Sequence, residues 1–419
     1  MSLPERIVVV GGGQAGLQAA CSLRDEKFAG SILLLGEEAC LPYRRPPLSK
    51  TYIEGSLAPD ALVLRASTFL ADKEIELRAS DPVIAIERAE RKVRTKSGRY
   101  FPYDHLVLAT GTRNRPLSAA GVDLDGVCYL RSISDATRLR KSLAEAKRLV
   151  IIGGGFIGLE VAGVARKLDI PTTVLDVAPR LMARAVSSLM SEYFHDFHAR
   201  SGVAFRYETG VDEIIGVNGR VAGVLLNSGE KLVADLVLIC IGVLPNTELA
   251  AAAQLAVEDG IVVDNFLTTS DPNISAIGDC ASFPCWGDGE RRRLESVQNA
   301  VDQGRSVAAK LMGRPKRYAS VPWFWSDQRD AKLHIAGLTT GHDEVLLSGE
   351  MGDGVFSVFC FKNRALVGVE SINRPADHIA ICRLLQQGFR PSPDQIVDFR
   401  FNVKALEAYA RSCAVEVRP

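Results

Sequence analysis

The sequence lacks a surplus of either charge, and it has no long apolar run. Lysine plus arginine and aspartate plus glutamate number 50 each. Without a basic excess, we do not expect the chain to bind nucleic acid or a membrane surface. No apolar stretch approaches the length of a membrane span, and Ile7–Val10 is too short for the core of a signal peptide. We therefore expect a cytoplasmic globular protein of two to three domains.

Paired cysteine motifs are also absent. The nine cysteines are scattered, their number is odd, and no CxxC occurs. This pattern favours free, mostly buried thiols in a reducing compartment, and it supplies neither a metal site nor a set of iron–sulfur ligands. Cys280 and Cys285 follow a glycine–aspartate pair rather than a second strand, so we interpret them as structural.

What the sequence does contain is a strand–glycine loop–helix–strand pattern that occurs twice. The apolar run Arg6–Val10 leads into the glycine-rich stretch Gly11–Gly16, a helix and a second strand over Ser31–Leu35. The same order begins again at Arg148–Ile152, with its glycines in Gly153–Gly158. Two such units predict an α/β fold with two Rossmann-type dinucleotide-binding domains.

In the first unit, each glycine of the fingerprint has a physical role. Gly11 permits the tight turn, Gly13 lets the backbone approach a pyrophosphate, and Gly16 lets the helix pack on the strand. The free N–H groups and positive dipole end of the helix then face the phosphate. Glu37 lies about 20 residues further on, where an acid binds ribose hydroxyls.

In the second unit, Gly153, Gly155 and Gly158 repeat these roles. Asp176 ends the following strand, and a carboxylate there binds ribose hydroxyls and repels a 2′-phosphate. The second site is therefore predicted to prefer NADH over NADPH. Arg180 and Arg184 lie nearby and leave alternatives open, because they could serve a 2′-phosphate, cap a helix or bind the pyrophosphate.

The remaining segments predict smaller elements. Val83–Ile86, Lys92–Thr95 and Leu106–Ala109 are expected to form an antiparallel meander, and a long helix is expected from about Glu295 to Leu311. From about Ser320 the sequence pattern changes, and it predicts an α+β C-terminal domain. The expected domains are a first dinucleotide-binding domain over 1–112 and 243–319, a second dinucleotide-binding domain over 113–242, and a C-terminal domain over 320–419.

Five motifs carry a resemblance to a known family. Ala109-Thr110-Gly111 and Gly278-Asp279 resemble the two downstream signatures of glutathione-reductase-like FAD proteins, which makes the first fingerprint the FAD site. Three further stretches are more specific: LPYRRPPLSK at 41–50, LESVQNA at 294–300 and PWFWSDQ at 322–328. With the fingerprints, they closely resemble the oxygenase-coupled, putidaredoxin-reductase-like NADH:ferredoxin reductases over essentially the whole chain.

The resemblance implies specific site residues. Lys50 would pair with Glu160 beside the flavin, where the hydride arrives, and these two are the expected catalytic residues. Trp325 would lie near the flavin, although a plain core aromatic is the alternative. The expected FAD contacts are Gly11, Gly13, Ala15, Gly16, Glu37, Arg45, Lys50, Val83, Ala109, Thr110, Gly111, Arg131, Gly278, Asp279, Glu295, Ser296, Val297 and Trp325. The expected NAD contacts are Gly153, Gly155, Phe156, Ile157, Gly158, Glu160, Asp176 and Gly242.

The resemblance also implies a partner. With no dithiol in the chain, electrons from NADH would leave FAD one at a time for a [2Fe-2S] ferredoxin that serves a cytochrome P450 or a ring-hydroxylating oxygenase. Ferredoxins are usually acidic, so we expect a small, transient, salt-sensitive contact with a basic face on a monomer or weak dimer. Its candidates are Arg291, Arg292, Arg293, Arg305 and Lys332, with His334 on the same strand as Lys332.

Two alternatives stay open. Disulfide reductases of this fold carry a redox cysteine pair after the second strand, and here that segment contains only Cys40. Because a single-cysteine variant occurs in NADH oxidases and peroxidases, an NADH oxidase or disulfide reductase that uses Cys40 is the first alternative. The second is a redox-signalling flavoprotein similar to apoptosis-inducing factor, against which the zero net charge and the lack of a basic tail count.

Overall fold

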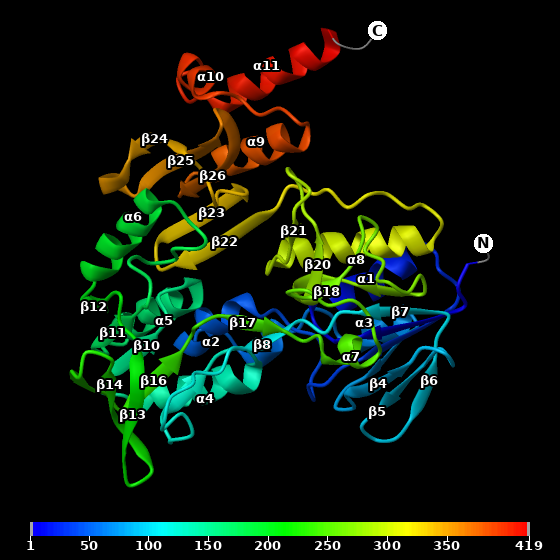
Figure 1. Ribbon diagram of the computed structural model, residues 1–419, viewed down its shortest axis with the longest axis horizontal. Coiled ribbons are helices and arrows are strands. Elements are labelled where there is room, and N and C mark those ends of the chain that lie inside the picture. Colours follow the sequence, from blue (N-terminus) through cyan, green and yellow to red (C-terminus); the bar gives the residue numbers. More distant parts are fainter. Residues whose placement is uncertain (1–2, 417–419) are drawn as a thin grey trace. The chain divides into compact units, whose positions relative to one another are not determined.

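The computed structural model describes residues 3–416 (Figure 1). The chain divides into two compact units, each built from three segments. The first unit comprises residues up to 44, 59–113 and 243–322, and the second comprises 45–58, 114–242 and the residues from 323 onward. In the part of the chain that the structure describes, no helix combines the length and apolar character needed to cross a membrane.

A five-stranded parallel sheet forms the centre of the first unit. Its strand order is β19-β7-β1-β2-β3, and the predicted strands at both ends of the first glycine loop are confirmed. Helices α1 and α8 pack against each other in this unit. The bounds are β1 Arg6–Val10, β2 Ser31–Leu35, β3 Ile75–Arg78, β7 His105–Leu108, β19 Ile274–Ala276, α1 Gln14–Asp25 and α8 Val297–Leu311.

One predicted strand pairing in this unit is wrong. The antiparallel meander consists of β4 (Val83–Glu87), β5 (Lys92–Thr95) and β6 (Tyr100–Pro102). The segment predicted as its third strand, Leu106–Ala109, instead falls largely in β7 of the parallel sheet. Every residue of β7 is buried, which is the pattern of a strand covered on both faces rather than of a meander strand.

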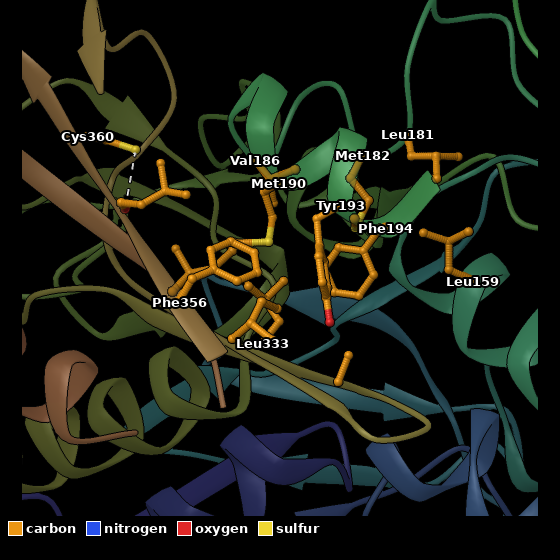
Figure 2. Close-up of a cluster of buried hydrophobic side chains, with 14 residues drawn as sticks. Leu159, Leu181, Met182, Val186, Met190, Tyr193, Phe194, Leu333, Phe356 and Cys360 are labelled. Atoms are coloured by element: carbon orange, nitrogen blue, oxygen red, sulfur yellow. Dashed lines mark hydrogen bonds between the residues drawn. The ribbon is translucent and has the colours of Figure 1, made fainter. Parts of the chain in front are cut away.

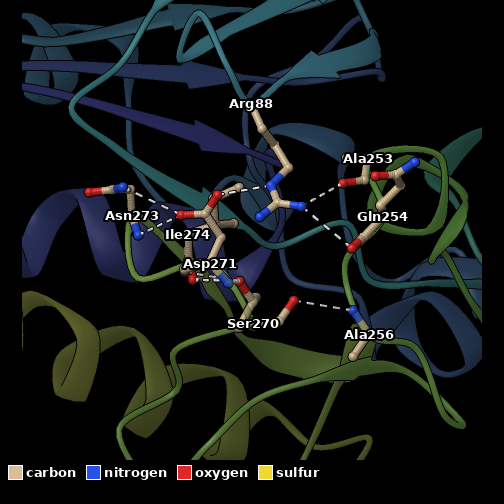
Figure 3. A network of polar contacts seen from close by, with 9 residues as sticks. Arg88, Ala253, Gln254, Ala256, Ser270, Asp271, Asn273 and Ile274 are labelled. Carbon is tan, nitrogen blue, oxygen red and sulfur yellow. Dashed lines mark hydrogen bonds and ion pairs between the residues drawn. The ribbon is translucent and has the colours of Figure 1, made fainter.

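A polar network fixes the loop that leads into β19 (Figure 3). Arg88, at the end of β4, donates to Asp271 Oδ2 at 2.9 Å and to the Ala253 carbonyl at 3.1 Å. The other carboxylate oxygen of Asp271 accepts from the backbone N–H of Asn273 at 2.9 Å. This network therefore anchors the segment that continues into Gly278 and Asp279.

The first unit also contains shorter elements. They are η2 Pro59–Leu62, α3 Ser67–Asp72, α7 Glu248–Ala252, β18 Ile261–Val262, η3 Gly278–Cys280, β20 Ala281–Pro284 and β21 Arg291–Arg292, with β8 Thr112–Asn114 and β17 Val243–Pro245 at its borders.

The second unit contains another five-stranded parallel sheet, in the order β12-β11-β10-β16-β9. The predicted strands on either side of the second glycine loop and the helix between them are confirmed. The bounds are β9 Val127–Tyr129, β10 Leu149–Ile152, β11 Thr172–Leu175, β12 Val203–Arg206, β16 Leu236–Ile239, α4 Ile133–Glu145, α5 Phe156–Lys167 and α6 Ser188–Ala199. The sheet β13 Val211–Val217, β14 Arg220–Leu226 and β15 Lys231–Val233, with η1 Pro46–Ser49 and α2 Thr51–Glu54, completes this part.

The C-terminal part of the second unit is an antiparallel sheet with helices, as the sequence predicts. Its order is β22-β23-β26-β25-β24, and the sequence missed β22 and the two last helices. The bounds are β22 Trp323–Gln328, β23 Ala331–Gly337, β24 Glu344–Glu350, η4 Met351–Asp353, β25 Val355–Lys362, β26 Ala365–Ile372, α9 Pro375–Gln386, α10 Pro393–Asp398 and α11 Val403–Glu416.

A shared core joins this antiparallel sheet to α5 and α6 (Figure 2). Leu159 of α5 and Phe194 of α6 belong to the same buried cluster as Leu333 and Phe356 of the sheet. Burial of large apolar side chains contributes roughly 1.5–3 kcal/mol each. The C-terminal sheet is therefore held firmly against the helix that carries Glu160.

Candidate active site

The first glycine loop has the geometry of a phosphate cradle. Gly11 has φ +122°, and a Cβ there would lie 2.0 Å from the carbonyl oxygen of Ala109. A Cβ on Gly16 would lie 2.0 Å from the Gly11 carbonyl oxygen, so both positions exclude a side chain. At Gly13 a Cβ would meet nothing within 4 Å, although this residue caps α1. That open space beside free helix N–H groups fits a pyrophosphate.

The loop Ala109–Gly111 faces Gly11 and is held by a residue that sequence reasoning missed. Asn246 donates from its side chain to the Thr110 carbonyl at 2.9 Å and from its backbone N–H to the Gly111 carbonyl at 2.9 Å. In the opposite direction, the Thr110 hydroxyl donates a hydrogen bond of 2.6 Å to the Asn246 carbonyl. The turn signal Pro245-Asn246 was the only local hint of this role.

The second FAD signature packs directly on α1. The N–H of Gly278 donates to Gln303 Oε1 of α8 at 2.7 Å, and a Cβ on Gly278 would lie 2.9 Å from the Cβ of Ala15. Asp279 follows within the short η3 turn. Val83 is buried on β4, and Glu37 is exposed just beyond β2. The first unit thus brings together the predicted residues of the fingerprint and of both downstream signatures.

Helix α8 begins two residues later than predicted. The hydroxyl of Ser296 accepts from the N–H of Asn299 at 3.0 Å, so Ser296 is the N-cap and Val297 the first helical residue. Glu295 lies outside the helix, and its carboxylate pairs with Arg293 at 2.6 Å.

The second glycine loop repeats the first. A Cβ on Gly153 would lie 2.3 Å from the Cys240 carbonyl oxygen, and one on Gly158 would lie 2.3 Å from the Gly153 carbonyl oxygen. Gly155 is again open within 4 Å, and Gly242 has φ +96°. The same cradle therefore fits a second dinucleotide, at the N-terminus of α5.

Asp176 is tied to this loop. Its Oδ2 accepts from the N–H of Gly154 at 2.7 Å, and its Oδ1 accepts from the N–H of Ala178 at 2.8 Å. A carboxylate oxygen can accept more than one hydrogen bond, so ribose hydroxyls can still reach it.

The two nearby arginines differ in their surroundings. Arg180 donates to the carbonyls of Ala183 and Val186, both at 2.9 Å, and to the Ser191 hydroxyl at 2.6 Å. Its guanidinium therefore binds the loop before α6. Arg184 is exposed, and its guanidinium lies 3.8 Å from the Cβ position of Gly242.

Lys50 and Glu160 form an ion pair within the second unit. Lys50 Nζ lies 2.7 Å from Glu160 Oε1, and Glu160 is only 6% exposed. The Ser326 hydroxyl donates to Oε1 at 2.6 Å, and the Ser49 hydroxyl donates to Oε2. Both serines lie in the motifs quoted above, but no local pattern connects them with Glu160.

Other predicted residues of the second unit are placed near these elements. Arg45 donates to the carbonyl of Arg131 at 2.6 Å. Phe156 packs on Phe324 with ring centroids 4.6 Å apart, and Ile157 is 37% exposed at the start of α5. Trp325 is partly buried, and its ring centroid lies 5.5 Å from that of Trp323.

The predicted docking cations do not form one free patch. Arg291 donates to the Val263 carbonyl at 2.9 Å, Arg292 pairs with Asp288, and the side chain of Arg293 is only 10% exposed. Arg305 is 64% exposed on α8 and lies 3.7 Å from Asp302. Lys332 is exposed as well, but it belongs to the second unit.

Burial keeps several of the described cysteine thiols protonated. Eight cysteines have described side chains, and none of these forms a disulfide. Burial raises the pKa of Cys280 and of Cys285, and burial together with Glu160 raises the pKa of Cys240 to about 12. Cys40 is partly buried in the first unit. Raised pKa values keep thiols protonated and therefore weakly nucleophilic.

Comparisons with known proteins agree with this geometry. Residues 5–304 match the family model described as pyridine nucleotide-disulphide oxidoreductase, and residues 323–407 match the reductase C-terminal model. Rhodocoxin reductase of Rhodococcus erythropolis is 49% identical over 95% of this chain and 93% of its own.

Two solved structures are similar over nearly the full length. The ferredoxin reductase for the CYP199A2 system of Rhodopseudomonas palustris has a TM-score of 0.94 at 46% identity, covering 96% of this chain and all of its own. The covalent putidaredoxin reductase–putidaredoxin complex gives 0.94 at 37% identity, covering 98% of this chain and all of the matched chain.

Proposed function

The chain belongs to the pyridine nucleotide-disulphide oxidoreductase family, and we propose that it passes electrons from NADH through FAD to a [2Fe-2S] ferredoxin that serves a cytochrome P450 or a ring-hydroxylating oxygenase. It is an oxidoreductase that uses FAD and NAD(H), and its partner is a ferredoxin. The observation that carries the proposal is the ion pair between Lys50 and the buried Glu160, which lies on the helix that follows the second glycine loop.

The buried pair is better explained by function than by stability. Transfer of two charges from water to the interior costs several kcal/mol per ion, and apolar residues in their place are often equally stable. Three donors surround the Glu160 carboxylate: Lys50, Ser49 and Ser326. Lys50 donates a second hydrogen bond to the Pro46 carbonyl at 3.3 Å. A lysine ammonium has three protons, so one stays available for a ligand.

The two glycine loops would hold the two nucleotides. The open position at Gly13 and the N–H groups of α1 would bind the pyrophosphate of FAD, with Glu37 on its ribose. Gly155, the N-terminus of α5 and Asp176 would do the same for NADH. When bound, FAD accepts two electrons as a hydride and can release them singly. The ammonium of Lys50 would stabilise the negative charge that arrives with them.

The ferredoxin would dock transiently on a basic face that includes Arg305. Arg305 lines a groove of about 560 Å³ beside α1, whose charged lining consists of the cations Arg305, Arg314, Lys316 and Arg317 and the acids Asp25, Glu26 and Asp302. Exposed charges of this kind mainly accelerate association, and salt screens them. Arg305 and Arg314 also pair with acids of the chain, but their side chains are 64% and 58% exposed, against 35% for Arg292 and 10% for Arg293, so we centre the proposal on this groove. We further propose that the protein is a cytoplasmic monomer or weak dimer, with an FAD-binding domain over 1–112 and 243–319, an NAD-binding domain over 113–242 and a C-terminal domain over 320–419.

The alternatives based on Cys40 and on redox signalling are not favoured. The named relatives are a rhodocoxin reductase and ferredoxin or putidaredoxin reductases. No observation on Cys40 supports a reactive thiol over a structural one.

Electron transfer from NADH through FAD to ferredoxin is tested in the absence of oxygen. The FAD-loaded protein is titrated with NADH and then mixed with an oxidised [2Fe-2S] ferredoxin in a stopped-flow instrument. We expect one NADH to reduce one flavin, and each reduced flavin to reduce two ferredoxins. The variant Cys40→Ser should behave in the same way. A protein whose NADH-reduced flavin delivers no electrons to any [2Fe-2S] ferredoxin tested, or whose turnover depends on Cys40, would contradict the proposal.

A further inference from the structure

Helix α5 and strand β22 meet along matched faces. Positions 156, 160 and 163 lie on one face of the helix because they follow its i, i+4, i+7 period, and positions 324, 326 and 328 alternate onto one face of the strand. Phe156 packs on Phe324, and Glu160 accepts from Ser326. The aromatic pair already supplies apolar contact, so the polar pair beside it calls for another explanation.

A line of buried polar side chains continues from Glu160 into the C-terminal sheet and back to α6. The hydroxyl of Ser326 accepts from Gln328 Nε2 at 3.3 Å. Gln328 Oε1 lies 2.8 Å from His198 Nε2. Ser326, Gln328 and His198 are 0%, 1% and 0% exposed, so no bulk water competes for these hydrogen bonds.

The direction of these hydrogen bonds is fixed by chemistry. An amide oxygen only accepts, so the Nε2 of His198 carries a proton and donates it to Gln328. Burial lowers the pKa of His198 to about 4, so the ring is neutral at physiological pH and its Nδ1 is left unprotonated. Gln328 donates to Ser326, and Ser326 therefore turns its own proton toward Glu160. Every bond points toward the carboxylate, and such aligned chains strengthen one another.

We propose that Ser326, supported by Gln328 and His198, is a positioning residue that holds the Glu160 carboxylate in the orientation from which it fixes Lys50 for hydride transfer from NADH. Ser326 and Lys50 bind the same oxygen of Glu160, at 2.6 and 2.7 Å. Without this hydroxyl, Ser49 would still hold Oε2 but Lys50 alone would hold Oε1, so the carboxylate would tilt and the ammonium would move with Oε1. This inference rests on the proposed function and names a further residue group of the same site.

The experiment is a double-mutant cycle on flavin reduction by NADH in single turnovers. Because a hydrogen bond to a charged group is worth roughly a tenfold change or more, we expect Ser326→Ala to slow reduction about tenfold or more. NADH affinity should stay within about twofold, since Ser326 acts through Glu160. Ser326→Thr keeps the hydroxyl and should restore most of the rate. In an E160Q background, Ser326→Ala should add less than about twofold, because the charge that it orients is gone.

A matched control is Ser357→Ala. Ser357 is also fully buried in the same sheet and donates to Asp377 at 2.7 Å, away from Glu160. We expect Ser357→Ala to leave the rate of flavin reduction unchanged. If Ser326→Ala slows reduction equally with and without Glu160, or if Ser326→Thr is as slow as Ser326→Ala, the residue is structural and the inference is wrong.

A second measurement does not depend on activity. In protein with ¹⁵N-labelled histidine, NMR should find His198 as the neutral Nε2–H tautomer, and Gln328→Leu should shift its Nε2 resonance. A proton on Nδ1 instead would overturn the proposed direction of the chain. If NADH does not reduce the flavin of the wild-type protein, both the proposed function and the role of Ser326 are wrong. If wild-type reduction is normal but the effects of Ser326→Ala and E160Q are additive, only the role of Ser326 is wrong.

Discussion

The two glycine loops have nearly the same backbone packing, but the helices that follow them carry different side chains. In both, the first and last glycines exclude a Cβ through contacts of 2.0–2.3 Å with a carbonyl oxygen, and the middle glycine is open. Both loops open a helix whose first turn holds no acid that would repel phosphate. The cradle for a dinucleotide is thus built twice from the same few constraints.

The helices that follow the loops differ two residues past the last glycine. The first helix carries Gln18 there, and its amide donates to Ser22 one turn later at 2.9 Å. The second carries Glu160, which is buried and paired with Lys50. We propose that the first loop only binds its nucleotide, whereas the second also places the charge pair. On this proposal, a repeated fold acquires a reaction through one side chain and the neighbours that support it.

Acid should weaken both units, because each contains a buried neutral histidine. Burial, with a smaller contribution from the Lys310 cation, lowers the pKa of His105 to about 3, and burial lowers that of His198 to about 4. Unfolded histidine has a pKa near 6.5, so the unfolded chain binds protons first as the pH falls. Stability is complete above about pH 6.5 and decreases below it. By pH 5, each histidine should cost about 2 kcal/mol.

The measurement is thermal unfolding at pH 7.5 and pH 5. The variants His105→Gln and His198→Gln should each flatten the pH dependence of Tm for the unit that contains them. An equal Tm at the two pH values, or variants with an unchanged slope, would contradict this origin of the acid sensitivity.

Alanine substitutions at the middle glycines of the two loops should show which nucleotide each loop binds. A methyl group at Gly13 or Gly155 meets no protein atom within 4 Å, so Gly13→Ala and Gly155→Ala should fold normally. Each should fill phosphate space in its own site and lower affinity there about 100-fold. Gly13→Ala should lose FAD, measured by flavin content. Gly155→Ala should keep FAD and raise the Kd for NADH. If both variants lose the same nucleotide, the assignment of the two loops is wrong.

The acid after the second strand should set cofactor preference. Asp176→Asn removes the charge that repels a 2′-phosphate while keeping an acceptor for a loop N–H. We expect the ratio of kcat/KM for NADH over NADPH to fall about tenfold. The matched variant Glu37→Gln, at the exposed acid just beyond β2, should leave this ratio unchanged. A ratio that stays the same in Asp176→Asn would show that other residues select the cofactor.

The smallest expected effect concerns the basic groove. Arg305→Glu should slow association with ferredoxin several-fold at low salt, and the loss should shrink as salt screens the charge. Arg291→Ala is the comparison, because its guanidinium binds carbonyls of its own chain. Stopped-flow kinetics with reduced protein gives both rates. Equal, salt-independent effects of the two variants would place the ferredoxin elsewhere.

Local features of the fold could be predicted from the sequence, and long-range pairings could not. Apolar runs and glycine spacing fix β1, β10 and both loops, because their causes lie within a few residues. The partner of Leu106–Ala109 is a non-local choice, and a short apolar run does not reveal it. Ser326 and Glu160 are 166 positions apart, and Thr110 and Asn246 are 136 apart. No sequence period encodes such contacts, so these positioning residues emerge only from the structure.

The most direct test compares the same position in the two helices. Glu160→Gln and Gln18→Ala are loaded with FAD, mixed with NADH without oxygen, and followed by the loss of flavin absorbance. Because loss of one group that orients a charge at the reacting centre typically slows catalysis about 100-fold or more, we expect Glu160→Gln to reduce its flavin at least about 100-fold more slowly than wild type. Gln18→Ala should stay within about twofold of wild type. Flavin reduction in Glu160→Gln at the wild-type rate would contradict the assignment of the chemistry to the second loop.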